Sequence, residues 1–190
     1  MRKLSSRKKT KKRRLKSILN DKSILTCEVL KENLHYDTHT GIFTWVKKKS
    51  RVRVGKRAGY ITKKGYRSVE INGKAYPCHR LAWLYMTGKF PEKQVDHINH
   101  IKDDNRWCNL REVTNQENQM NTPIRLDNTS GVTGVYWKKE NSKWSACIRF
   151  DGKLNHLGYF LLKEDAIASR KEAEIKYGFH ENHGKVHYVE

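Results

Sequence analysis

The sequence predicts an α+β protein built from small antiparallel sheets and short helices. Three observations predict this class. Residues 40–77 and 130–160 carry alternating β-branched and aromatic residues between turn signals. Residues 80–87 and 163–177 repeat apolar residues at helical spacing, and two short strands near residue 100 precede a helix-capping sequence. We expect a small sheet, then a strand–strand–helix unit, then a three-stranded antiparallel sheet packed on one helix.

The chain begins with a basic segment. Residues 1–24 hold eleven Lys or Arg and one acid, Asp21. Because residues 1–16 cannot bury apolar surface and repel one another, we expect a disordered arm that runs into a short helix near residues 17–30. Such arms bind nucleic-acid backbones, although a solubilising tail or a nuclear-localisation segment has the same composition.

A small antiparallel sheet is expected at residues 40–77. Asn72-Gly73 is a strong signal for a two-residue hairpin between two of its strands. A helix follows at about residues 80–87, and Gly88 can cap its end. The exposed face of the sheet carries the basic residues that we expect to contact DNA: Lys63, Lys64 and Arg67.

The formal net charge of +20 indicates a polyanionic partner. Residues 45–75 again hold eleven Lys or Arg and one acid, so this segment and residues 1–24 together account for the whole excess. Lys and Arg pair with phosphates and release condensed counterions. We expect double-stranded DNA as the partner.

Several other classes are disfavoured. The four cysteines form no Cys-x-x-Cys pair, so we expect no structural zinc. No secretory signal is apparent, and the apolar runs are far shorter than the ~20 residues of a membrane span. We therefore expect a cytoplasmic protein with no membrane partner and no small-molecule cofactor.

The most polar stretch of the chain combines residue types that suit phosphodiester hydrolysis. We expect a strand that contains Asp96 and His97, then a loop that ends at Asn109, a second strand at 110–113 and a helix that contains Asn118. Thr114 and Glu117 form a capping box, which starts this helix, and the helix runs to about Thr122. A strand–strand–helix unit of this kind can bring these side chains toward one point. His97 suits a general base because its ordinary pKa lies near neutrality. Asp96 and the side-chain oxygen of Asn118 suit one Mg²⁺ or Mn²⁺ ion. Asn109 can brace the loop and hold the His97 ring, although adjacent residues such as Asp96 and His97 converge only where the strand twists or bulges.

This stretch resembles the HNH endonucleases of phage and group I intron homing type. The similar segments are CHRLAWLYMTGKFP, VDHIN and DDNRWCNLREVTNQEN, and the resemblance covers roughly residues 34–121. It implies a ββα-metal (His-Me finger) core, cleavage that leaves 5′-phosphate and 3′-hydroxyl ends, and the same roles for His97, Asp96, Asn118 and Asn109. The helix residue is Asn118 where the name of the family implies His, and Asn is a usual variant in the phage-type branch. His100 either touches phosphate or metal or is a solvated loop residue.

The last part of the chain is predicted to form three strands and a helix. Trp144, Ala146, Ile148 and Phe150 alternate with polar residues, and Asp151-Gly152 signals a hairpin. GVYW, KWSACIRF, LGYF and EDAIASRKEA make residues 130–178 similar to the Apetala (ethylene-response-factor) DNA-binding domain, whose sheet enters the major groove. Tyr136 replaces the Arg of the plant domain, so its base preference is not transferred. We expect DNA contacts from the sheet face opposite the helix, at Tyr136, Lys138, Lys143 and Arg149, unless this sheet only packs against the nuclease core.

The predicted organisation is an arm with a short helix (1–33), a nuclease domain (34–122), a linker (123–129), a DNA-binding domain (130–178) and a tail (179–190). The predicted function is that of a metal-dependent DNA endonuclease. Two alternatives stay open: a DNA-binding or regulatory protein whose HNH fold has lost activity, and a nuclease directed at RNA.

Overall fold

The computed structural model describes residues 25–48 and 52–185. The predicted arm at 1–16 and the first part of the helix expected at 17–30 lie outside the described residues. Contacts divide the chain into two compact units. The first comprises the described residues up to Tyr36 together with Phe43–Phe90, and the second comprises Asp37–Ile42 and the described residues from Pro91 on. The domain boundaries expected from the sequence stay a prediction.

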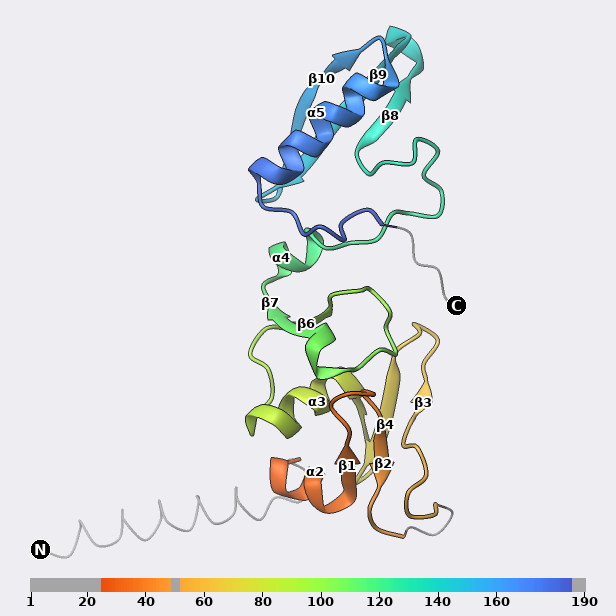
Figure 1. Ribbon diagram of the computed structural model, residues 1–190, viewed down its shortest axis with the longest axis vertical. Coiled ribbons are helices and arrows are strands. Elements are labelled where there is room, and N and C mark those ends of the chain that lie inside the picture. Colours follow the sequence, from red (N-terminus) through yellow and green to blue (C-terminus); the bar gives the residue numbers. More distant parts are fainter. Residues whose placement is uncertain (1–24, 49–51, 186–190) are drawn as a thin grey trace, which may run out of the picture. The chain divides into compact units, whose positions relative to one another are not determined.

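The first unit consists of two helices and two small sheets, drawn from orange to yellow-green in Figure 1. Its elements are α2 (Cys27–Asn33), β1 (Leu34–Tyr36), β2 (Phe43–Trp45), β3 (Tyr60–Ile61), β4 (Arg67–Ile71), β5 (Lys74–Pro77) and α3 (Cys78–Thr87). Strands β1 and β2 pair antiparallel, and β3, β4 and β5 form a separate antiparallel sheet in that order. The largest fully buried side chains of this unit belong to Leu30, Leu34, Phe43, Ile71 and Leu81.

The local signals of the first unit are confirmed, with one change of arrangement. Asn72 and Gly73 join β4 to β5 with φ of 53° and 76°, the left-handed conformation that a tight hairpin requires. Helix α3 ends at Gly88, whose φ is 79°. The single sheet expected at 40–77 is instead split in two, because β2 pairs with β1, which precedes that range.

The second unit begins with a pair of strands followed by a helix. Strands β6 (Gln94–His97) and β7 (Leu110–Val113) pair antiparallel, and the short helix η1 (Trp107–Asn109) ends the loop between them. Helix α4 (Asn115–Gln119) starts at the predicted capping box, in which Thr114 Oγ1 accepts from Glu117 N and Glu117 Oε2 accepts from Thr114 N at 2.7 Å. The helix is shorter than expected.

The early end of α4 has a tertiary cause. The carbonyl of Met120 accepts from the backbone N–H of His180 at 3.1 Å, and the carbonyl of Thr122 accepts from Gly184 at 2.9 Å. Both carbonyls lie within or just after the helix expected to run to Thr122. They are satisfied by a segment near the other end of the unit, so the chain does not need to continue the helix to pair them.

The rest of the second unit is a three-stranded sheet covered on one face by a helix (Figure 1). Its elements are β8 (Val135–Lys138), the short helix η2 (Lys139–Asn141), β9 (Lys143–Phe150), β10 (Lys153–Phe160) and α5 (Lys163–Lys176). The strand order is β10-β9-β8, and Asp151 and Gly152 form the turn between β9 and β10 with φ of 50° and 71°. Val135, Ala146 and Ala166 form the core between sheet and helix. The predicted order of three strands and a helix is confirmed.

The helices within the described ranges are short and carry many charged residues. None of them combines the length and the apolarity that crossing a membrane requires.

Candidate active site

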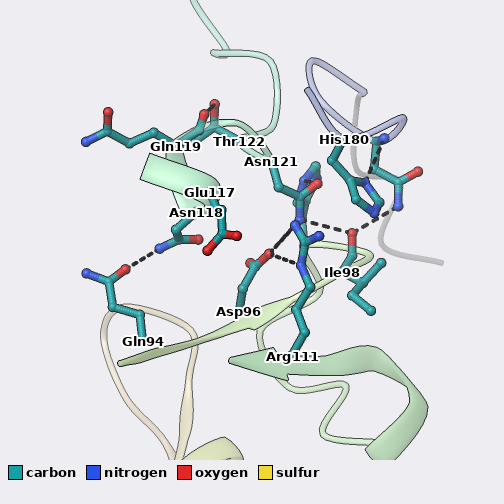
Figure 2. Close-up of polar contacts among 12 residues, drawn as sticks. Gln94, Asp96, Ile98, Arg111, Glu117, Asn118, Gln119, Asn121, Thr122 and His180 are labelled. Atoms are coloured by element: carbon teal, nitrogen blue, oxygen red, sulfur yellow. Dashed lines mark hydrogen bonds and ion pairs between the residues drawn. The ribbon is translucent and has the colours of Figure 1, made fainter. Parts of the chain in front are cut away.

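Asp96 lies at the centre of a polar cluster on β6. The residue is 7% exposed, and its Oδ2 accepts from Arg111 Nε at 3.1 Å and Nη2 at 2.9 Å. The same oxygen accepts from Asn121 Nδ2 at 2.8 Å. Figure 2 shows these bonds converging on one carboxylate from β7 and from the residues after α4. The three donors fix the carboxylate, and no hydrogen bond to its Oδ1 occurs within the described part of the chain.

Asn118 lies on α4 but does not bond to Asp96. Its Nδ2 donates to Gln94 Oε1 at 2.6 Å, which ties α4 to the start of β6. Figure 2 places Asp96 beneath α4, with Asn118 on one side of it and Asn121 on the other. The structure therefore gathers both predicted metal-binding residues at one end of α4, while a different asparagine makes the direct contact with Asp96.

His97 is buried at the end of β6. It is 4% exposed, and its Nε2 lies 3.3 Å from Asn105 Oδ1. Burial lowers the pKa of His97 below its ordinary value, against the opposing hydrogen bond to Asn105 and the charge of Asp96. Because an amide oxygen only accepts, this contact favours the tautomer with the proton on Nε2 and a basic Nδ1. Asp96 and His97 thus engage different partners, as alternation along a strand requires.

Asn109 braces the loop between the two strands. Its Nδ2 donates to Asn99 Oδ1 at 2.9 Å and to Asp104 O at 2.8 Å, and its Oδ1 accepts from Asn99 N at 2.9 Å. Its backbone carbonyl accepts from Ile98 N at 2.9 Å. These four bonds connect Asn109 to the loop, and the role predicted for Asn109 in the site stays a prediction. They hold the backbone that directly follows His97.

Asn121 is the residue that sequence reasoning missed. It is 2% exposed, and it links Asp96 to His100, whose Nε2 lies 2.9 Å from Asn121 Oδ1. His100 has a positive φ of 65°, an uncommon conformation for a residue with a side chain. Its spacing in the sequence could have indicated its position. Asn121 follows Asn118 by three residues, so it lies about one helical turn further on and on a similar side of the chain.

The predicted DNA-contacting residues fall in both units. In the first unit, Lys63 and Lys64 are exposed in the turn between β3 and β4, while Arg67 is half-buried and donates to Gly59 O at 3.2 Å. In the second unit, strand register places four others together on the sheet face opposite α5. These are Tyr136, Lys138, Lys143 and Arg149.

The face opposite α5 also carries His156 and Tyr159, of which Tyr159 was not expected there. Lys138 Nζ donates to Tyr159 Oη at 3.1 Å and lies 5.3 Å from the centre of the Tyr159 ring. The rings of His156 and Tyr159 are 4.4 Å apart. Tyr136 and Tyr159 are each more than 40% exposed. This face therefore combines positive charge with accessible aromatic rings.

Comparison with known proteins bears directly on this site. A family model described as HNH endonuclease matches residues 76–120, the stretch that contains β6, β7 and α4. Protein 3.8 of Escherichia phage T7 is 32% identical over 81 residues, which are 42% of this chain and 67% of that protein. The chain belongs to the HNH endonuclease family.

A solved structure of an HNH endonuclease is also similar. It is that of the HNH homing endonuclease I-HmuI, described for DNA binding and cleavage, and it is 32% identical to this chain with a TM-score of 0.36. The match covers 46% of this chain and 52% of I-HmuI, so the chain spans about half the length of that relative. The matched family model ends at residue 120, and the Apetala-like character of residues 130–178 stays a prediction.

HNH nucleases generally use a divalent metal ion. Hard divalent ions such as Mg²⁺ bind through oxygen ligands. Asp96 Oδ1 and Asn118 Oδ1 have no hydrogen-bond partner among the described residues, and both are hard oxygen donors. The described residues contain no group of three or more His, Cys, Asp or Glu placed to hold a metal. Two oxygen ligands fit an ion that keeps several waters, as Mg²⁺ does.

Proposed function

We propose that this HNH endonuclease hydrolyses phosphodiester bonds of double-stranded DNA in the manner of homing-type enzymes and depends on Mg²⁺ or Mn²⁺. The observation that carries the proposal is the pairing of a fixed carboxylate with a buried imidazole on successive residues of β6. Asp96 is held by Arg111 and Asn121, and His97 has a lowered pKa beside Asn105. A lowered pKa keeps the imidazole neutral near pH 7, the state that a general base requires.

His97 takes the proton of the attacking water through Nδ1 in the proposed mechanism. The contact with Asn105 and the bracing of the loop by Asn109 support a fixed orientation for the ring. Asp96 and Asn118 would hold the metal ion, which when bound neutralises charge on the phosphate and the leaving oxygen. The scissile strand would then end in a 3′-hydroxyl and a 5′-phosphate.

The sheet face opposite α5 is proposed as a DNA-recognition surface. Exposed Tyr136 and Tyr159 offer rings for stacking or apolar contact with bases, and Lys138, Lys143 and Arg149 offer charge. Lys63 and Lys64 in the other unit would contact phosphates. The Apetala-like character of residues 130–178 is part of this proposal.

A DNA-binding protein without nuclease activity is the second candidate. The observation that favours it is the engagement of the proposed metal ligands, since Arg111 forms an ion pair with Asp96 and Asn118 bonds to Gln94. A guanidinium beside the carboxylate competes with a metal ion for the same negative charge. The two candidates therefore differ in cleavage and not in DNA binding.

Plasmid cleavage tests the proposal. The wild-type protein should nick or cut plasmid DNA in Mg²⁺ or Mn²⁺ and stop in EDTA. His97→Ala should lower the rate by ~10²–10⁴-fold, because removing a general base usually costs that much. DNA binding by gel shift should stay within a few-fold of wild type. Binding without metal-dependent cleavage by the wild type would favour the second candidate.

A further inference from the structure

The segment that follows α5 packs against the polar cluster of the nuclease site. We name residues 179–185 the C-terminal strap. Its backbone bonds to the chain just after α4, from His180 N to Met120 O at 3.1 Å and from Gly184 N to Thr122 O at 2.9 Å. Ile124 N donates back to Lys185 O at 3.4 Å. The strap is therefore fixed along its length to residues 120–124.

The other side of the strap is anchored to α5. His183 is 5% exposed, and its Nε2 lies 3.1 Å from Arg170 Nη2. Burial lowers the pKa of His183 to about 4, so the ring is neutral near pH 7 and can accept from the guanidinium. Arg170 also donates to Glu174 at 3.0 Å and to Cys147 O at 2.8 Å. These bonds join the strap to both the helix and β9.

Asn182 reaches from the strap to Ile98, which directly follows the strand that carries Asp96 and His97. Its Nδ2 donates to Ile98 O at 2.9 Å across 84 residues of sequence. Each of its other polar groups is also engaged: its backbone N donates to His180 Nδ1 at 3.1 Å, and its Oδ1 accepts from Lys185 Nζ at 2.9 Å. Its carbonyl accepts from Lys185 N at 3.1 Å. The side chain is therefore held in one orientation toward Ile98.

Ile98 is the residue at which the polar cluster and the strap meet (Figure 2). Its carbonyl accepts from both Asn182 Nδ2 and Asn121 Nδ2, the latter at 3.3 Å. The same Asn121 amide donates to Asp96 Oδ2. A carbonyl oxygen has two lone pairs and an amide has two hydrogens, so these three bonds use the full capacity of Ile98 O and of the Asn121 amide. Ile98 also follows His97 directly.

We propose that Asn182 is a positioning residue of the nuclease site. By holding Ile98 O, it fixes the backbone after His97 and the amide that orients Asp96. The C-terminal strap then contributes to the geometry of the nuclease site, in addition to its attachment to α5 and β9. The inference rests on the proposed function where DNA cleavage rates are measured. Where Mn²⁺ binding is measured, it rests only on the proposed metal site.

Two substitutions in the full chain test the role. Asn182→Ala removes the donor to Ile98, and Asn182→Asp keeps the size of the side chain but replaces the donor with an acceptor. Each should lower kcat by about 10-fold and leave KM for DNA within twofold. This is the lower end of the 10–100-fold that direct partners of metal ligands typically contribute, because Asn182 acts on Asp96 only through Ile98 O and the Asn121 amide. Each should also weaken Mn²⁺ binding, measured by calorimetry without DNA, by about 10-fold.

Asn155→Ala is the matched control. This asparagine lies on β10, and its Nδ2 makes only a 3.5 Å contact with Lys153 O. It should leave kcat, Mn²⁺ affinity and the urea midpoint unchanged. If Asn182 only attaches the strap, its variants will show a lower urea midpoint while kcat and Mn²⁺ affinity of the folded protein match wild type, and the inference is wrong. Should Asn182→Ala fail to fold, Asn182→Asp decides.

The failure of the proposed function would look different. In that case the wild type itself would not cleave DNA, and the Asn182 variants would be judged by Mn²⁺ affinity alone. An unchanged Mn²⁺ affinity in both variants would overturn the positioning role whatever the activity of the wild type.

Discussion

Two asparagines on successive turns near the end of α4 have different environments. Asn121 is 2% exposed and bonds to Asp96, His100 and Ile98, whereas Asn118 is half-buried and bonds to Gln94. A buried amide that satisfies buried partners supports the fold, because its loss leaves those partners unpaired. An amide at the surface of the cluster with a free oxygen suits ligand binding. The two residues should therefore respond differently to truncation.

Asn121→Ala should lower the free energy of unfolding by about 1–3 kcal/mol, the usual cost of leaving buried polar groups without a partner. Asn118→Ala should change it by less than about 0.5 kcal/mol, as is usual for partly exposed positions, while weakening Mn²⁺ binding. Urea denaturation at neutral pH measures the first quantity and calorimetry the second. Equal losses of stability in the two variants would contradict this division of roles.

The turn at Asp37–Ile42 supports the loop that carries the partner of His97. Thr38 O accepts from Trp107 N at 3.0 Å, just after Asn105. Gly41 has a φ of 71°, and a Cβ at this position would overlap the backbone of Asn105 and Arg106. Glycine is thus needed here for two reasons, a left-handed backbone and a close approach between two chain segments.

Gly41→Ala should therefore displace the loop as well as strain the turn. We expect a loss of more than about 1 kcal/mol in unfolding free energy, since alanine at an incompatible φ costs at least that much, and a fall in cleavage rate through the displaced Asn105. Gly131→Ala is the control, because Gly131 has a φ of 81° with open space around its would-be Cβ. Urea denaturation and plasmid cleavage compare the two variants. Indistinguishable variants would mean that the close approach has no consequence.

The charge of the whole molecule is unevenly distributed. The excess of +20 lies in residues 1–24 and 45–75, while the sheet module adds aromatic rings beside its lysines. Charge on an exposed turn binds phosphates without regard to sequence, and rings with few charges contribute contacts that depend less on salt. Affinity and discrimination should consequently be separable by mutation.

The double variant Lys63→Ala/Lys64→Ala should weaken binding to all DNA and reduce the log–log salt slope by roughly 0.9 for each phosphate that the protein no longer neutralises. Tyr136→Ala should leave the slope unchanged and reduce discrimination between sites by about 1–3 kcal/mol, the value of a good base contact. Filter-binding titrations over a salt series on a preferred and a random fragment measure both. A steeper or shallower salt slope in Tyr136→Ala would contradict the recognition role proposed for the sheet face opposite α5.

The sequence by itself determined the features that depend on neighbouring residues. The hairpin at Asn72-Gly73, the capping box of Thr114 and Glu117, and the order of strands and helices follow from backbone preferences that act over a few residues. The HNH resemblance rested on the same local order and is confirmed by the family match. The roles assigned to His97, Asp96, Asn109 and Asn118 stay predictions.

Only the tertiary structure decided which side chains meet. Spacing placed Asn118 beside Asp96, but Asn121, which lies in the turn after the end of α4, makes that contact. The bond from Asn182 to Ile98 joins residues 84 positions apart, and no local pattern marks either partner. The end of α4 likewise depends on carbonyls that pair with the strap. Hydrogen bonds between distant segments are set by how those segments pack, and short-range preferences in the sequence carry no information about that packing.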